Sequence, residues 1–187
     1  MLVTQTADQT KNWIQDTCLI MGYSILIALS GKLALRFSFT PVPLFFQVNL
    51  IWAAGLFLGS RRAFLAVALF VAQGLAGLPV FSSGQSGLAV LLSPVGGYIA
   101  SYAFAAFLIG YLYERSNQKT ISAFLSLTAG MCLTYAIGCL WLAKFVGFAN
   151  VLMLGVAPFI AKGMIVNGLF ASQGRLRNLY TLWRGRA

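Results

Sequence analysis

Acidic residues and histidine are what this sequence has least of. Its 187 residues include 3 aspartates and glutamates and no histidine. The absence of histidine excludes a Ser-His-Asp triad, histidine-based acid catalysis and a histidine metal site. The acids Asp8, Asp16 and Glu114 lie outside the apolar segments, so no buried carboxylate pair is available. The sequence therefore predicts neither an enzyme nor a metal or cofactor site.

Cysteine and charge of either sign are scarce as well. Cys18, Cys132 and Cys139 lie in apolar segments without metal-ligand spacing, which predicts packing residues. Charged residues make up 9% of the chain and hydrophobic residues 59%, whereas a soluble domain carries about 25% charged residues. The composition indicates an integral membrane protein. A crossing needs about twenty apolar residues, so the chain has room for roughly six helices in one domain, residues 1–187.

The charge that is present is mostly basic and lies at few places. The net charge is +10 from 13 lysines and arginines, but Arg61, Arg62, Arg115 and Lys119 lie in two predicted loops and most of the others lie at the chain ends. This is the distribution of the positive-inside rule rather than a nucleic-acid patch. It predicts that both termini and these two loops are cytoplasmic, in a multi-pass protein of the cell membrane. The polar first twelve residues do not have the form of a cleaved signal peptide.

The predicted fold is therefore an all-α bundle of six transmembrane helices. The apolar segments run over 17–37, 44–58, 63–75, 96–113, 121–146 and 151–171. A glycine-rich stretch, residues 77–98, connects helices three and four on the outer side. Irregular backbone at membrane depth is tolerated where it is buried in protein or lines a cavity. The stretch is predicted to cap a pocket, and the alternative is a plain extracellular connection.

Four stretches carry a family resemblance. They are TPVPLFFQ (40–47), GLFLGSRRAFLAVALFVAQGLAGLPVF (55–81), GLAVLLSPVGGYI (87–99) and APFIAKGMIV (157–166). Together they resemble the BioY family, the biotin-binding S components of energy-coupling-factor vitamin transporters. The resemblance implies a six-helix protein that captures biotin with high affinity at the outer face. It also implies a transmembrane T component and two cytoplasmic ATPases as partners, and delivery of the ligand by reorientation of the S component in the membrane.

The sequence departs from the family pattern at several positions. Phe45 stands where the family usually has threonine, and Ser93-Pro94-Val95 stands where it usually has Gly-Pro-Thr. The usual last-helix motif is PF-x-x-G-D-x-x-K, and here Gly163 and Val166 replace the aspartate and the lysine. Residues four apart share a helix face. Our hypothesis is that Lys162 and Asn167, each one turn from a lost charge, replace the missing pair.

Biotin offers a carboxylate, a ureido ring and an apolar body, so its pocket needs a cation, neutral polar groups and apolar walls. Lys162 is predicted to meet the carboxylate, with Lys32 as competitor and with snorkelling to the interface as the alternative. Further ligand contacts are predicted for Gln47 and Asn167, although such amides also join helices. The motifs and the outer stretch add the ligand-binding predictions Phe81, Ser83, Gly84, Ser93 and Tyr98.

Small residues on the first segment suggest a partner surface. Ser24-x-x-x-Ala28 and Ser30-x-x-x-Ala34 allow close helix approach. They are similar to an Ala-x-x-x-Ala surface with which the family contacts the T component, so Ser24, Ala28 and Ala34 are the predicted interface residues.

The leading functional interpretation is the membrane-embedded biotin-binding subunit of an ATP-driven vitamin importer. The alternative is a stand-alone facilitator or carrier for biotin or a biotin precursor, because the sequence has no feature that shows partner subunits.

Overall fold

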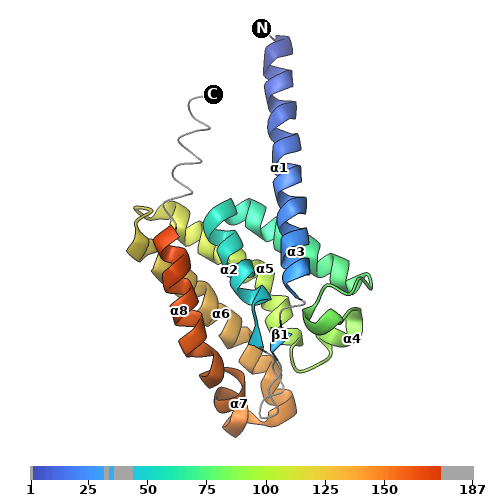
Figure 1. Ribbon diagram of the computed structural model, residues 1–187, viewed down its shortest axis with the longest axis vertical. Helices are drawn as coiled ribbons and strands as arrows, with labels where there is room; N and C mark the ends of the chain where they lie inside the picture. Colours follow the sequence, from blue (N-terminus) through green and yellow to red (C-terminus); the bar gives the residue numbers. More distant parts are fainter. Residues whose placement is uncertain (1, 32–33, 36–43, 174–187) are drawn as a thin grey trace.

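The computed structural model describes residues 2–31, 34–35 and 44–173. The long helices are α1 (Leu2–Ser30), α2 (Gln47–Leu58), α3 (Ser60–Leu75), α5 (Gly96–Arg115), α6 (Thr120–Val146) and α8 (Ala157–Gln173). Shorter elements are β1 (Ala34–Leu35), β2 (Leu44–Phe45), η1 (Ser82–Gly84), α4 (Leu88–Leu91) and α7 (Phe148–Gly155). Figure 1 shows the long helices packed into a bundle from which the beginning of α1 projects.

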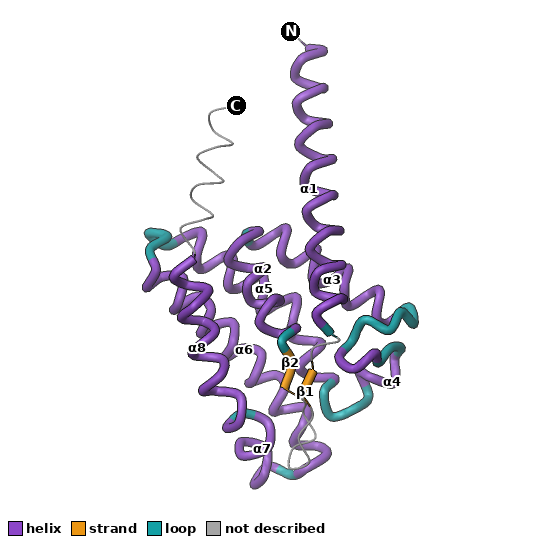
Figure 2. The backbone as a smooth tube through the Cα atoms, viewed as in Figure 1, coloured by secondary structure: helices purple, strands orange, loops and turns teal. Residues whose placement is uncertain are grey.

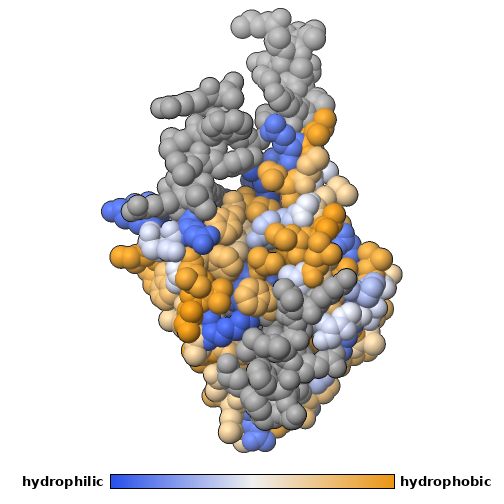
Figure 3. Space-filling model, viewed as in Figure 1, coloured by the Kyte–Doolittle hydropathy of each residue, from blue (hydrophilic) through white to orange (hydrophobic). Residues whose placement is uncertain are grey.

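The buried core lies where α5 meets α2, α3 and α6. Its largest fully buried side chains include Trp52, Phe70, Ile109, Tyr113 and Leu127. Among the described residues, three helices are long and apolar enough to cross a membrane, namely α1 over Trp13–Ser30, α5 and α6, and α2 is a shorter apolar helix. Much of the body in Figure 3 is covered by hydrophobic residues, and hydrophilic residues gather at the end where α1 emerges.

Most predicted helix bounds agree with the structure, and those of the first and last segments differ. The first segment was predicted to begin at residue 17, but α1 begins at Leu2. It was also predicted to continue to residue 37, but α1 ends at Ser30. The reason is that the carbonyl of Gly31 accepts the Ser83 N–H at 3.1 Å, so the chain leaves the helix there. Beyond it, Ala34 pairs with Phe45 and Leu35 with Leu44 in a two-residue antiparallel ladder.

The second difference is in the last segment. It consists of two helices, α7 and α8, which meet at Val156 in a non-helical conformation, φ −129° and ψ −52°. Figure 1 shows α7 at one end of the bundle and α8 running from there along α6 towards the end where α1 projects.

The connection between α3 and α5 folds back onto the bundle. The Gly87 N–H donates to the carbonyl of Gly74 at 2.8 Å, and the Ser83 N–H reaches Gly31 at the end of α1. In Figure 2 these loop segments surround α4 beside that end of α1. The glycine-rich stretch is therefore packed against α1 and α3.

The arginines predicted to lie in loops belong to helix ends, Arg61 and Arg62 to the first turn of α3 and Arg115 to the last turn of α5, and these ends lie together. The backbone N–H and the hydroxyl of Ser60 donate to Glu114 at 3.0 and 2.7 Å, which places the α2–α3 turn beside the end of α5. At the same end, Arg62 forms a 2.7 Å ion pair with Asp16 of α1. Arg61, Arg62 and Arg115 are consequently on one side of the bundle.

Candidate ligand-binding site

A cavity of about 440 Å³, counted with its open mouth, lies between α2, α5, α6 and α8. We call it the main cavity. Its lining residues are Val48, Asn49, Trp52, Tyr98, Tyr102, Thr134, Tyr135, Phe159, Lys162 and Gly163. This volume counts all space not filled by atoms, and the room between the side chains is far smaller than that of small-molecule sites, about 300–1,000 Å³. The space between the side chains is narrow, so a ligand of vitamin size requires the lining aromatic rings to shift.

One wall of the main cavity is fixed by an indole. Trp52 Nε1 donates to Thr134 Oγ1 at 3.1 Å, and that hydroxyl donates in turn to the Gly130 carbonyl at 2.9 Å. The ring of Tyr135 meets Trp52 edge to face, with 6.1 Å between the ring centroids. This part of the wall joins α2 to α6 and is almost fully buried at Trp52.

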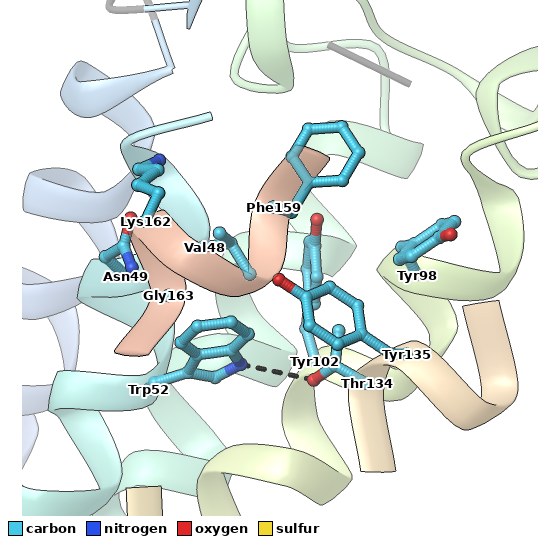
Figure 4. Close-up of a pocket in the computed structure, with 10 residues that line it drawn as sticks. All are labelled: Val48, Asn49, Trp52, Tyr98, Tyr102, Thr134, Tyr135, Phe159, Lys162 and Gly163. Carbon is cyan, nitrogen blue, oxygen red and sulfur yellow. Dashed lines mark hydrogen bonds between the residues drawn. The ribbon is translucent and has the colours of Figure 1, made fainter. Parts of the chain in front are cut away.

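Two tyrosine hydroxyls face the space and a third does not. Figure 4 shows the hydroxyls of Tyr102 and Tyr135 directed towards the region between Trp52 and Phe159. The hydroxyl of Tyr98 instead donates to the Gly155 carbonyl at 3.0 Å, where α7 ends. Tyr98 thus contributes its ring to the cavity and its hydroxyl to the packing of α7.

Charge reaches the cavity from α8. Lys162 is half-buried, and its Nζ lies 5.3 Å from the centroid of the Phe46 ring. Among the described residues that line the main cavity, Lys162 is the one with a charged side chain. A cation on an apolar wall favours an anionic group on the ligand.

Asn49 supplies a buried acceptor at the same cavity. The residue is 1% exposed, and its Oδ1 has no hydrogen-bond partner among the described residues. Buried polar atoms are normally paired, so an orphan atom in a cavity wall needs an explanation. A ligand N–H donor would provide one.

A second, narrower cavity, about 240 Å³ when its open mouth is counted, lies beneath the α3–α5 connection. It is lined by Gln47, Phe81, Ser82, Gln85, Val90, Val95, Ile99 and Tyr102. Tyr102 also lines the main cavity, so the two spaces are neighbours on either side of this ring.

Gln47 is 3% exposed and is fully engaged at the second cavity. Its Nε2 donates to the carbonyls of Ile27 and Val80, both at 2.9 Å, and its Oε1 accepts from the Ser82 hydroxyl at 3.2 Å. The side chain therefore joins the end of α1, the beginning of α2 and the α3–α5 connection.

The predicted ligand-binding residues divide into three groups in the structure. Tyr98 and Lys162 line the main cavity, and Gln47 and Phe81 line the second. The remaining four, Ser83, Gly84, Ser93 and Asn167, line neither cavity.

Each of these four residues is either exposed or in contact with other parts of the protein. Ser83 and Gly84 are exposed in the α3–α5 connection, with positive φ angles of 60° and 75°. The hydroxyl of Ser93 donates to the Val90 carbonyl at 2.6 Å, and its own carbonyl accepts from Trp141. Asn167 is completely buried, with its Nδ2 3.8 Å from the sulfur of Met131. The predicted pair is thus divided, because Lys162 lines the main cavity whereas Asn167 is buried outside it.

The remaining predictions concern Lys32 and the partner-interface residues of the first segment. Lys32, the predicted competitor for a carboxylate, lies outside the described residues. Ser24 is completely buried and donates to Gln73 at 3.1 Å, and Ala28 is half-buried. Ala34 belongs to β1 rather than to α1. A partner would reach Ser24 only if α1 and α3 separated, and the interface stays a prediction.

The structure adds residues that sequence reasoning did not select. Tyr102 follows Tyr98 by four residues, and this spacing puts both on one face of α5. Phe159 belongs to the PF motif of the last helix, but the predictions from this motif concerned only its missing aspartate and lysine. Val48 and Thr134 have no sequence signal beyond their place in apolar helices.

Comparison with known proteins identifies relatives that match most of the chain. A model of the BioY family matches residues 4–179. A probable biotin transporter BioY from Pyrococcus horikoshii is 33% identical over 151 residues, which cover 81% of this chain and 88% of the relative. The biotin transporter BioY of Rhizobium etli is 34% identical, with 81% and 86% covered.

A solved structure agrees with these relatives. The crystal structure at 2.1 Å of the S-component for biotin from an ECF-type ABC transporter superimposes with a TM-score of 0.81. Its sequence is 26% identical, and the match covers 91% of this chain and 93% of the other.

Proposed function

Because the chain belongs to the BioY family, we propose that it is the membrane-embedded subunit that captures biotin for an ATP-driven importer. The observation that carries the proposal is the main cavity, whose aromatic walls enclose neutral polar groups and one lysine. Biotin presents a carboxylate, a ureido group and an apolar body, and these match the three kinds of group in the wall.

The roles in the cavity follow from its chemistry. Lys162 would attract the carboxylate, while Asn49 Oδ1 and the hydroxyls of Tyr102 and Tyr135 would meet the ureido group. Trp52, Phe159 and the ring of Tyr98 would enclose the apolar body. Entry of the ligand would require these rings to move. The α3–α5 connection, which lies over the second cavity, would then close above Tyr102.

The membrane arrangement has support of its own. The chain is a multi-pass membrane protein. We infer one transmembrane domain of six spans in the cytoplasmic membrane, with α7 and α8 together as the sixth. Both termini and the arginine-bearing end would face the cytoplasm, as the positive-inside rule requires. Partners of the T component and ATPase type would act from that side.

The proposal is tested by calorimetric titration of the purified protein with biotin and with a biotin amide that lacks the carboxylate. Wild-type protein should bind biotin at least tenfold more tightly than the amide. Lys162→Gln should remove that preference, because its side chain no longer carries the positive charge. Lys144→Gln is the matched control, since Lys144 is an exposed lysine 4.3 Å from the Trp141 ring and outside both cavities.

Two results would contradict the proposal. Folded wild-type protein that binds neither compound would mean that the changes at Gly163 and Val166 have redirected the site. An unchanged preference in Lys162→Gln would remove Lys162 from the carboxylate. The alternative, a stand-alone carrier, predicts biotin uptake by proteoliposomes that contain this chain alone.

A further inference from the structure

An aromatic surface runs along α3 and α5, away from both cavities. Phe64 meets Phe104 and Phe107 edge to face, with centroid distances of 6.0 and 6.3 Å. Phe107 stacks on Tyr111 at 5.9 Å, and the guanidinium of Arg115 lies 4.5 Å above the Tyr111 ring. The result is a continuous series of rings that ends in a cation.

The surface is hollowed into a groove. An open space of about 730 Å³ is lined by Arg61, Phe64, Leu65, Phe104 and Phe107. Phe104 is 59% exposed and Leu65 is 51% exposed, so no other described residue covers them. We call this feature the aromatic groove.

Arg61, which lines the groove, and Arg115, which lies over Tyr111, are at the same end of the bundle. Arg61 opens α3 and Arg115 closes α5, and the Ser60–Glu114 hydrogen bonds hold these two ends together. Glu114 is the nearby acid, and both of its carboxylate oxygens accept from Ser60. An anion at this end would therefore meet two guanidinium groups and a carboxylate that is already hydrogen-bonded.

The series of rings along α5, with Arg115 at its end, has about the length of one leaflet. From Phe104 to Arg115 there are 11 helical steps of about 1.5 Å, or about 16 Å. Half of a bilayer's hydrocarbon core is about 15 Å. An acyl chain laid along the rings would thus place its headgroup beside the arginines.

We propose that the aromatic groove is a binding site for an anionic phospholipid of the cytoplasmic leaflet. One acyl chain lies on Phe64, Phe104 and Phe107, and the phosphate is held by Arg61 and Arg115. Guanidinium groups suit phosphate because they donate paired hydrogen bonds. Basic sites of this kind on the cytoplasmic side of membrane helices select anionic headgroups. The site is independent of biotin capture.

The test uses the full-length protein in detergent with added phosphatidylglycerol or phosphatidylcholine. Native mass spectrometry measures how much of each lipid stays bound. Wild-type protein should retain phosphatidylglycerol in preference. Each arginine near the surface contributes roughly a fivefold gain, so Arg61→Gln/Arg115→Gln should lose roughly 25-fold and Arg115→Gln alone roughly fivefold.

Lys144→Gln serves as the matched control, because Lys144 also stands over an aromatic ring but at the opposite end of the bundle. It should retain phosphatidylglycerol as the wild type does. Equal retention of the two lipids, an equal loss in Lys144→Gln, or no loss in the arginine variants would overturn the proposal. A dimer that buries the groove and excludes lipid would overturn it as well.

Discussion

Replacing Gln47 by leucine should destabilise the protein more than any other single amide replacement in the described membrane helices. The change keeps the side-chain volume similar but removes three hydrogen bonds, to Ile27, Val80 and Ser82. Side-chain hydrogen bonds in membrane proteins average about 0.6 kcal/mol each, which gives about 2 kcal/mol for three. The Val80 carbonyl and the Ser82 hydroxyl also lose their partner, so we expect a total of about 2–3 kcal/mol.

The matched control is Gln73→Leu. Gln73 is also an amide on a membrane helix, and its Oε1 accepts a hydrogen bond from the Ser24 hydroxyl at 3.1 Å. Its loss should cost about 0.6 kcal/mol. Unfolding by SDS in mixed micelles, followed by circular dichroism, measures both variants against the wild type. Equal losses for Gln47→Leu and Gln73→Leu would refute the reasoning, because Gln47 would then not join the three segments.

Other variants separate packing from ligand contact. Tyr98→Phe removes the bond to the Gly155 carbonyl and should cost about 0.6–1.7 kcal/mol in the same unfolding assay. Tyr102→Phe, whose hydroxyl faces the main cavity, should keep its stability and weaken biotin binding in calorimetry; unchanged binding would contradict its role. Gly74→Val places a β-carbon on the Phe81 ring and should cost about 1–3 kcal/mol through overpacking, and a neutral result would show that Phe81 moves freely.

Most of the helical framework could be predicted from the sequence because charge interrupts the apolar runs. Arg61 and Arg62 mark the α2–α3 turn, and Glu114 to Lys119 mark the turn between α5 and α6. The end of α1 could not be predicted in this way. It depends on a hydrogen bond between Gly31 and Ser83, which are distant in sequence, and apolar residues continue past it.

The candidate site was predictable only in part, because a motif shows which residues are near in sequence and not where side chains point. Tyr98 and Lys162 belong to the resembling motifs and reach the main cavity. Ser83, Gly84 and Ser93 come from equally suggestive stretches, yet they line neither cavity, although residues next to them in sequence line the second. Asn167 shares a face with Gly163, but one helical turn of about 6 Å carries it past the cavity to Met131.

Gly163, which stands where the family usually has an aspartate, is closely packed in the wall of the main cavity. A β-carbon at this position would lie 2.7 Å from the sulfur of Met131 and 3.6 Å from the hydroxyl oxygen of Tyr135. The thioether therefore occupies the place that an aspartate side chain would need, and methionine is the residue that adapts most easily to such a gap. Lys162 brings a positive charge to the wall from a position one helical turn, four residues, before Val166. The described residues that line the main cavity include this cation and no carboxylate, so under the proposed function the anionic end of the ligand should contribute to affinity, which the comparison of biotin with its amide tests.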